Sequence, residues 1–133
     1  MEFHIPFKHI LTAAVIHFII GALWYAPFAF GRTWQNLVGL RKKDLPSQKK
    51  ALLFAFASSM LIATGMAYIV PHFDAVNILS GSSLGVLIWL FFMGSLSLYN
   101  YAFQGKSVTL ILIDNGYYLL GMTFLGSYFG SLV

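Results

Sequence analysis

The side chain with the clearest capacity for chemistry is Asp114, a carboxylic acid within a long apolar stretch. It follows Lys106 by eight residues, which is about 12 Å along an α-helix. A carboxylate at such a depth in a membrane is costly unless it is paired or hydrated, so it indicates a functional site. Asn115 adds an adjacent amide, and Tyr117 and Tyr118 share the helical face at i+3 and i+4, where their phenols could donate to Asp114. The alternative is an inter-helix hydrogen bond that only stabilises a bundle.

His17 is the second candidate, because it lies nine residues beyond Lys8 in another apolar stretch, about 13 Å along a helix. Histidine titrates near neutral pH and can relay protons. A pair of His17 and Asp114, direct or bridged by water, is the one proton-relay arrangement that the sequence offers. The alternative is a neutral His17 bonded to a serine or to a backbone carbonyl.

Motifs for enzymatic chemistry are missing from the sequence. It contains no cysteine, and it shows no nucleophile–base pair, phosphate-binding loop or nucleotide fingerprint. The other histidines match no metal-ligand spacing, and the basic segment lacks the interleaved aromatic residues of a nucleic-acid surface. We therefore expect no enzymatic activity, no metal or other cofactor, and no nucleic-acid partner.

The elements that must position these side chains are membrane helices. Only 9% of the 133 residues are charged, whereas 59% are hydrophobic and 17% are aromatic. A soluble domain of this length could not bury so much apolar surface. The predicted fold class is all-α, a four-helix transmembrane bundle that occupies residues 1–133 as a single domain. The charge-free runs place its helices at 7–30, 50–70, 78–103 and 107–131.

Basic residues are concentrated in the loop 31–49 and at the start of the following helix. Residues 32–50 contain six basic residues and one acidic residue, and cytoplasmic loops collect lysine and arginine. If this loop lies inside, Lys106 lies inside as well, and seven of the eight basic residues are then on that side. The charge pattern therefore predicts that both termini lie outside.

The same region carries groups that could bind lipid. An anionic inner leaflet attracts cationic side chains, although the basic loop could also be a solvated segment that only sets topology. Aromatic residues at the inner helix ends, Tyr99 and Tyr101 among them, are typical of an interfacial belt. The predicted interface anchors are Trp24, Tyr25, Arg32 and Trp34, and the predicted contacts to anionic lipid are Arg41, Lys42, Lys43, Lys49 and Lys50.

The chain could be a parallel tandem repeat of two helical hairpins. Residues 21–30 align without gaps with residues 94–103, and the alignment sets Asn100 opposite Pro27, which interrupts the first helix. Matched interruptions point to a transporter binding site, although the aromatic belt explains this region more simply. Small residues four apart favour close helix packing. Because four helices enclose little volume, we also expect a homo-oligomer.

Several motifs carry a resemblance to a known family. The run GALWYAP at 21–27, then Phe30-Gly31 and Trp34, resembles the opening signature of the DUF1761 family of small bacterial membrane proteins, which usually has serine where Ala26 stands. The resemblance implies a four-helix protein of a bacterial cytoplasmic membrane, but it implies no chemistry, because the activity of the family is unknown. We expect asparagine at position 114 in the family, so chemistry built on Asp114 would be particular to this protein. Further resemblances are Gly39-Leu40, Asp44-Leu45, Gly85, Trp89, Asn100-Tyr101, Phe103, Gly105, Ile113 and Gly116-Tyr117.

Three classes of function remain. The favoured class is a small oligomeric channel or transporter in which Asp114 and His17 line a polar path. The alternative is a non-catalytic structural, accessory or lipid-binding membrane protein that uses the aromatic belt and the basic loop. A membrane enzyme ranks third, because a reaction needs more polar side chains than these helices provide. The sequence does not identify a transported species.

Overall fold

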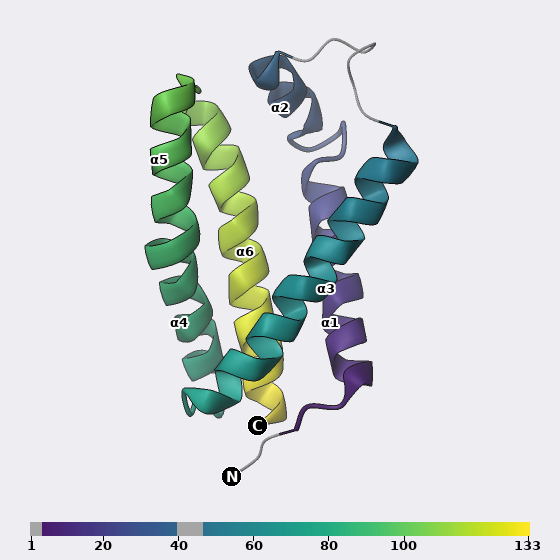
Figure 1. Cartoon of the computed structure of the whole chain (residues 1–133), viewed down its shortest axis with the longest axis vertical. Helices are drawn as coiled ribbons and strands as arrows, with labels where there is room; N and C mark the ends of the chain where they lie inside the picture. Colours follow the sequence, from purple (N-terminus) through teal and green to yellow (C-terminus); the bar gives the residue numbers. More distant parts are fainter. Residues whose placement is uncertain (1–3, 40–46) are drawn as a thin grey trace.

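The computed structural model of the chain describes residues 4–39 and 47–133. These residues form helices and contain no strand, which confirms the all-α class (Figure 1). Four helical stretches are long and apolar enough to cross a membrane, and α4, η2 and α5 together form one of them. In chain order the elements are α1 (Phe7–Trp24), α2 (Gly31–Val38), α3 (Gln48–His72), α4 (Ile78–Ile88), the π-helical η2 (Trp89–Gly94), α5 (Ser95–Gln104) and α6 (Val108–Leu132).

The first helix is shorter than the predicted range 7–30, because it ends at Trp24. Pro27 has no N–H to donate to the carbonyl of Leu23, and its ring would crowd that carbonyl, so a longer helix is disfavoured there. The chain turns instead, with the N–H of Phe30 donating to the carbonyl of Trp24 at 3.1 Å, and α2 begins at the next residue. The other three long helices begin and end within two residues of the predicted bounds.

Local signals set the ends of the later helices. Asn77 and Ser80 form a capping box at the start of α4, in which the Asn77 side chain accepts from the Ser80 N–H at 2.9 Å. Ser107 accepts from the N–H of Leu110 at the start of α6. Gly105 ends α5 with a φ of 62°, a conformation that favours glycine. The turn between α5 and α6 is therefore tight, and the two helices form an antiparallel hairpin.

Helices α4 and α6 pack backbone against backbone through glycines that lie four residues apart, Gly81 and Gly85 in α4 and Gly126 and Gly130 in α6. A Cβ added to Gly81 would meet the carbonyl oxygen of Gly126, and a Cβ added to Gly85 would meet that of Met122. The hydroxyls of Ser82 and Ser127 lie 2.6 Å apart across the same interface. These small residues serve contacts within one chain, so they give no support to the expected homo-oligomer, which stays a prediction.

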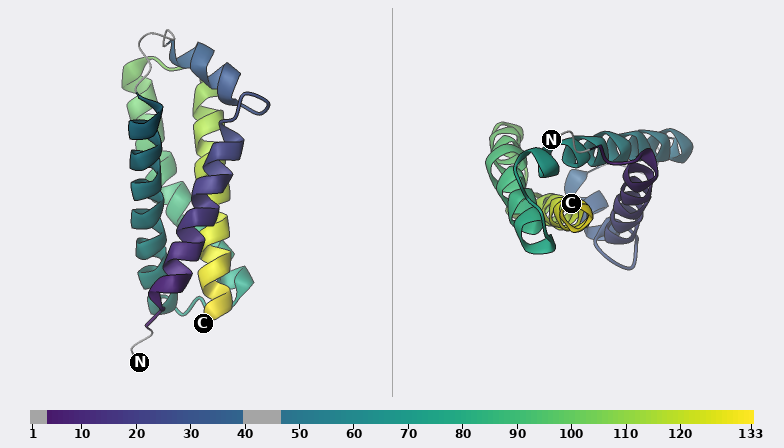
Figure 2. Two further views of the ribbon diagram at one scale, coloured as in Figure 1. Left: turned by 90° about the vertical axis from the view of Figure 1, so that its right-hand side faces the viewer. Right: turned by 90° about the horizontal axis from the view of Figure 1, so that it is seen from below.

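Helix α6 lies between the α4–α5 helix and the pair formed by α1 and α3 (Figure 2). The hydrophobic core lies in the half of the bundle that is nearer to the termini, and it includes the fully buried Ala13, Ala63 and Phe129. Helix α3 runs obliquely, and its buried residues begin only at Ser59, so its N-terminal half extends away from the bundle. Both termini lie at the end of the bundle opposite α2 (Figure 1). Which side of a membrane they face, and the tandem repeat, stay predictions.

Candidate functional site

The carboxyl group of Asp114 lies in α6 and is only 7% exposed. The hydroxyl of Tyr25, just past the end of α1, donates to its Oδ1 at 2.6 Å, and the hydroxyl of Tyr101, from α5, donates to its Oδ2. Burial raises the pKa of Tyr25, and the hydrogen bond to Asp114 raises it further, so this phenol stays a neutral donor. Three helical elements therefore meet at one carboxyl group through two uncharged donors.

The two aromatic residues of α2 and the preceding turn hold Tyr25 and Trp24 in place. Trp34 packs edge-on against Tyr25, with ring centroids 5.8 Å apart. The ring centroids of Phe30 and Trp24 are 4.7 Å apart. Trp24 also donates from Nε1 to the carbonyl of Ile113 at 3.0 Å, directly before Asp114. The predicted interface anchors Trp24, Tyr25 and Trp34 therefore also build the site, whereas the fourth, Arg32, is exposed.

His17 is buried, and it does not contact Asp114 directly. Its Nδ1 lies 2.9 Å from the Ser59 hydroxyl of α3 and 3.5 Å from the Tyr117 hydroxyl of α6. The serine contact is the alternative that the sequence left open. The Tyr117 ring meets the Tyr25 ring edge-on at a centroid distance of 5.5 Å. Polar and aromatic groups thus follow one another from Ser59 through His17, Tyr117 and Tyr25 to Asp114.

Two glycines make room for this arrangement. A Cβ added to Gly21 would lie 2.9 Å from the Tyr117 hydroxyl, and a Cβ added to Gly121 would lie 2.7 Å from Nε2 of His17. The missing side chain at Gly21 therefore allows Tyr117 to reach across toward α1. This space is consistent with the position of the Tyr117 hydroxyl beside His17.

The remaining predicted site residues lie at different distances from this centre. Asn115 is buried, donates to the Ser97 hydroxyl at 2.6 Å, and has no hydrogen-bond partner for Oδ1 among the residues that the structure describes. Tyr118 is half-buried and packs against Tyr117 with ring centroids 5.7 Å apart. Asn100 is exposed and does not join the site. Its neighbour Tyr101 does, although the sequence assigned that residue only to the aromatic belt.

The predicted lipid contacts are described only in part. Lys49 and Lys50 are exposed in the first turn of α3, near the end of the molecule that carries Asp114. Arg41, Lys42 and Lys43 lie outside the described residues.

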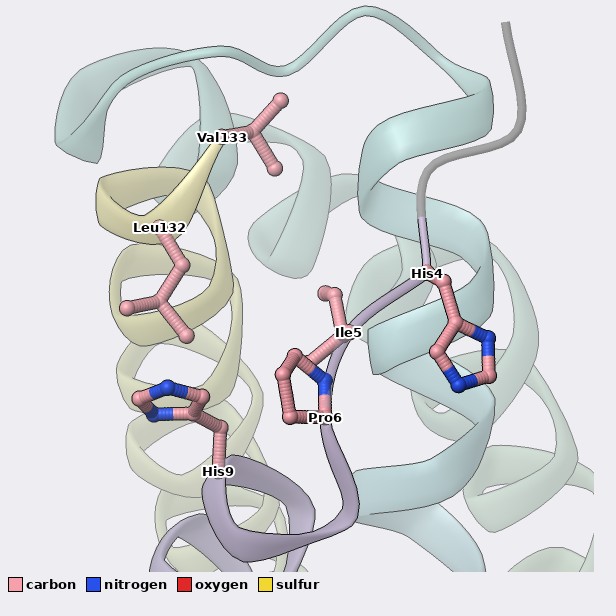
Figure 3. A pocket seen from close by; sticks show the side chains of 6 residues that line it. All are labelled: His4, Ile5, Pro6, His9, Leu132 and Val133. Atoms are coloured by element: carbon pink, nitrogen blue, oxygen red, sulfur yellow. The ribbon is translucent and has the colours of Figure 1, made fainter.

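A small pocket of about 130 Å³ lies at the opposite end of the bundle, between the N-terminal segment and the last turn of α6. Figure 3 shows the rings of His4 and His9 on opposite sides of Pro6. His9 lies 3.3 Å from the hydroxyl of Tyr128. Within residues 4–39 and 47–133 no cluster of three histidine, aspartate or glutamate side chains could hold a metal ion.

A matched pair of tryptophan substitutions tests the contact between α1 and α6. Trp24→Phe removes the hydrogen bond to the Ile113 carbonyl, and we expect it to lower the free energy of unfolding by about 1 kcal/mol. Trp89→Phe removes a buried Nε1 that has no partner among the described residues, so its hydrogen-bonding cost should be close to zero. Unfolding in mixed micelles, followed by circular dichroism, measures both. Equal losses in the two variants would contradict the assigned role of Trp24.

The fold and the site define an all-α protein with four membrane-compatible helices and a buried carboxyl group near one end. The chain belongs to the DUF1761 family, described as a protein of unknown function, whose pattern matches residues 9–130. The match covers nearly the whole chain, as the sequence motifs indicated. No curated protein and no solved structure matches this chain.

Proposed function

We propose that this protein is an integral membrane protein that conducts or transports protons or small cations through a path that includes Asp114. The observation that carries the proposal is the buried Asp114 carboxyl group, whose two hydrogen-bond donors, Tyr25 and Tyr101, are neutral phenols. A phenol can stabilise a carboxylate, but it does not neutralise the charge. A proton or another cation is needed for neutrality, and acidic groups with this requirement mark ion and proton pathways in membranes.

The polar groups beyond Asp114 support a path in the direction of His17. The Tyr25 ring contacts the Tyr117 ring, and the Tyr117 hydroxyl lies 3.5 Å from the imidazole of His17. Histidine accepts and releases protons near neutral pH. Water or a rotation of Tyr117 would be needed to join Tyr25 and His17, so the proposed path conducts through motion of these side chains. We also propose a homo-oligomer, because one chain of four helices encloses little volume.

The orientation in the membrane is part of the proposal. Lys49 and Lys50 begin α3 at the end that also carries α2 and Asp114, and the positive-inside rule assigns that end to the cytoplasm. Both termini would then lie outside, in a bacterial cytoplasmic membrane. Asp114 would accordingly lie in the inner half of the membrane.

A structural or accessory role is the second candidate, and one observation favours it. The contacts of Asp114 and Trp24 join the end of α1 to α5 and α6, so the same groups could serve only to stabilise the bundle. This role predicts no ion flux by the purified protein. We propose catalysis for neither role.

Flux in liposomes separates these candidates. The purified full chain is reconstituted in phosphatidylcholine and phosphatidylglycerol liposomes that contain a pH-sensitive or a sodium-sensitive dye, and a potassium gradient with valinomycin makes the interior negative. We expect wild-type liposomes to take up protons or sodium ions faster than protein-free liposomes of the same composition. Rates equal to those of protein-free liposomes with both dyes would contradict the proposal and favour the structural role.

A further inference from the structure

A groove of about 590 Å³ runs between α1 and the N-terminal half of α3. Helices α1 and α3 lie close together near the termini and diverge toward α2 (Figure 2). Small residues face the groove on both sides, including Gly21 and Ala22 of α1 and Ala51 and Ala55 of α3. Small residues usually allow helices to approach closely. In this protein the small residues line an open groove instead, which leaves room for a ligand.

The size of the groove suits a lipid chain. Its volume lies within the usual range of small-molecule sites, roughly 300 to 1,000 Å³. From Gln48 to Ser59 the α3 wall is about 17 Å long at helical rise, so much of an extended acyl chain can lie along it.

The charge at the end of the groove favours an anionic headgroup. Gln48 lines that end, and the exposed Lys49 and Lys50 follow it in the first turn of α3. None of the side chains that line the groove is acidic. Lys49 and Lys50 do not line the groove themselves, but they place two positive charges within one helical turn of Gln48. These charges would attract a phosphate at Gln48, while its acyl chain would run along the apolar walls toward Ser58 and Ser59.

We propose that the groove binds one acyl chain of an anionic phospholipid, with the headgroup at Gln48, Lys49 and Lys50. Tyr25 and Tyr117 also line the groove, so the bound acyl chain contacts the two aromatic rings that lie between Asp114 and His17. The site does not depend on ion transport by Asp114. If the protein binds lipid here but conducts no ions, this proposal stays intact and only the proposed function is contradicted.

Native mass spectrometry of the full chain tests the proposal, with dioleoylphosphatidylglycerol and dioleoylphosphatidylcholine as separate probes. We expect one tightly held phosphatidylglycerol per chain and a preference over phosphatidylcholine of about fivefold for each lysine. Ala55→Trp fills the groove and should abolish that preference. Ala57→Trp makes the same substitution at an exposed position that does not line the groove, and it should bind as the wild type does.

The double variant Lys49→Gln/Lys50→Gln tests the headgroup site without a change inside the groove. We expect it to bind the two lipids about equally. Its exposed positions preserve the fold, so it decides the question even if Ala55→Trp does not fold. Equal binding of both lipids by the wild type, an unchanged preference in the double variant, or full retention in folded Ala55→Trp would overturn the proposal. A wild-type dimer free of lipid that Ala55→Trp dissociates would assign the groove to a second copy and also overturn it.

Discussion

Replacing Gly81 with alanine is expected to force α4 away from α6 and to lower the free energy of unfolding by about 3 kcal/mol. The added methyl group would meet the backbone carbonyl of Gly126, which cannot move aside as a flexible side chain can. The nearest relief is a shift of one helix against the other. That shift would disturb the neighbouring contact of Gly85 with α6 and the hydrogen bond between Ser82 and Ser127.

Gly65→Ala is the matched control for this substitution. Gly65 also lies inside a long helix, but a Cβ added there meets no atom within 4 Å. Alanine favours helix more than glycine does, so we expect Gly65→Ala to be neutral or to stabilise by up to about 1 kcal/mol. Unfolding in mixed micelles with rising dodecyl sulfate, followed by far-ultraviolet circular dichroism, measures both variants. The same sign of change in both would refute the close approach of α4 and α6.

The second large effect is expected for Asp114→Ala, which should lower the free energy of unfolding by about 3 kcal/mol. Interhelical hydrogen bonds in membrane proteins contribute about 0.6 kcal/mol on average and up to about 1.7 kcal/mol. Alanine removes two of them at once and leaves the hydroxyls of Tyr25 and Tyr101 without their acceptor. The end of α1 then loses its polar connection to α5.

Asp114→Asn separates the loss of the acid from the loss of the side chain. The amide keeps one acceptor oxygen for a phenol, so we expect a cost of about 1 kcal/mol rather than 3. If the three-helix contact is real, Tyr25→Phe should cost about 1 kcal/mol in the wild type and much less in Asp114→Ala, where its partner is gone. Full additivity of Tyr25→Phe and Asp114→Ala in the same unfolding assay would show that the two side chains do not interact.

The sequence predicts the fold well because the charges mark the helix ends. Twelve charged residues leave four apolar runs, and three of the four helices begin and end within two residues of those predictions. The predicted first helix is too long, because the apolar residues continue through 25–30 whereas the helix ends at Trp24. Pro27 disfavours a helix there, and Tyr25, the first residue after the helix, donates to the carboxyl group of Asp114.

The candidate site could be predicted only in part. Depth and charge were enough to single out Asp114 and His17, and both are buried. Their partners depend on how helices rotate and cross, which spacing along one helix does not determine. The spacing allows Tyr117 and Tyr118 to donate to Asp114 from i+3 and i+4, yet the Tyr117 hydroxyl lies beside His17, where Gly21 leaves room for it. Tyr101 donates to Asp114 from α5, the helix before α6. From its aromatic side chain alone, the sequence predicts only a position at the membrane interface.

The most direct test of a functional role for Asp114 is the initial rate of cation uptake by liposomes that contain equal amounts of folded Asp114→Asn or Asp74→Asn protein. The two variants make the same chemical change, but Asp74 is exposed in the turn before α4, far from the site. We predict that Asp74→Asn conducts like the wild type and that Asp114→Asn falls to the rate of protein-free liposomes. Equal protein-dependent rates in the two variants would contradict a path through Asp114.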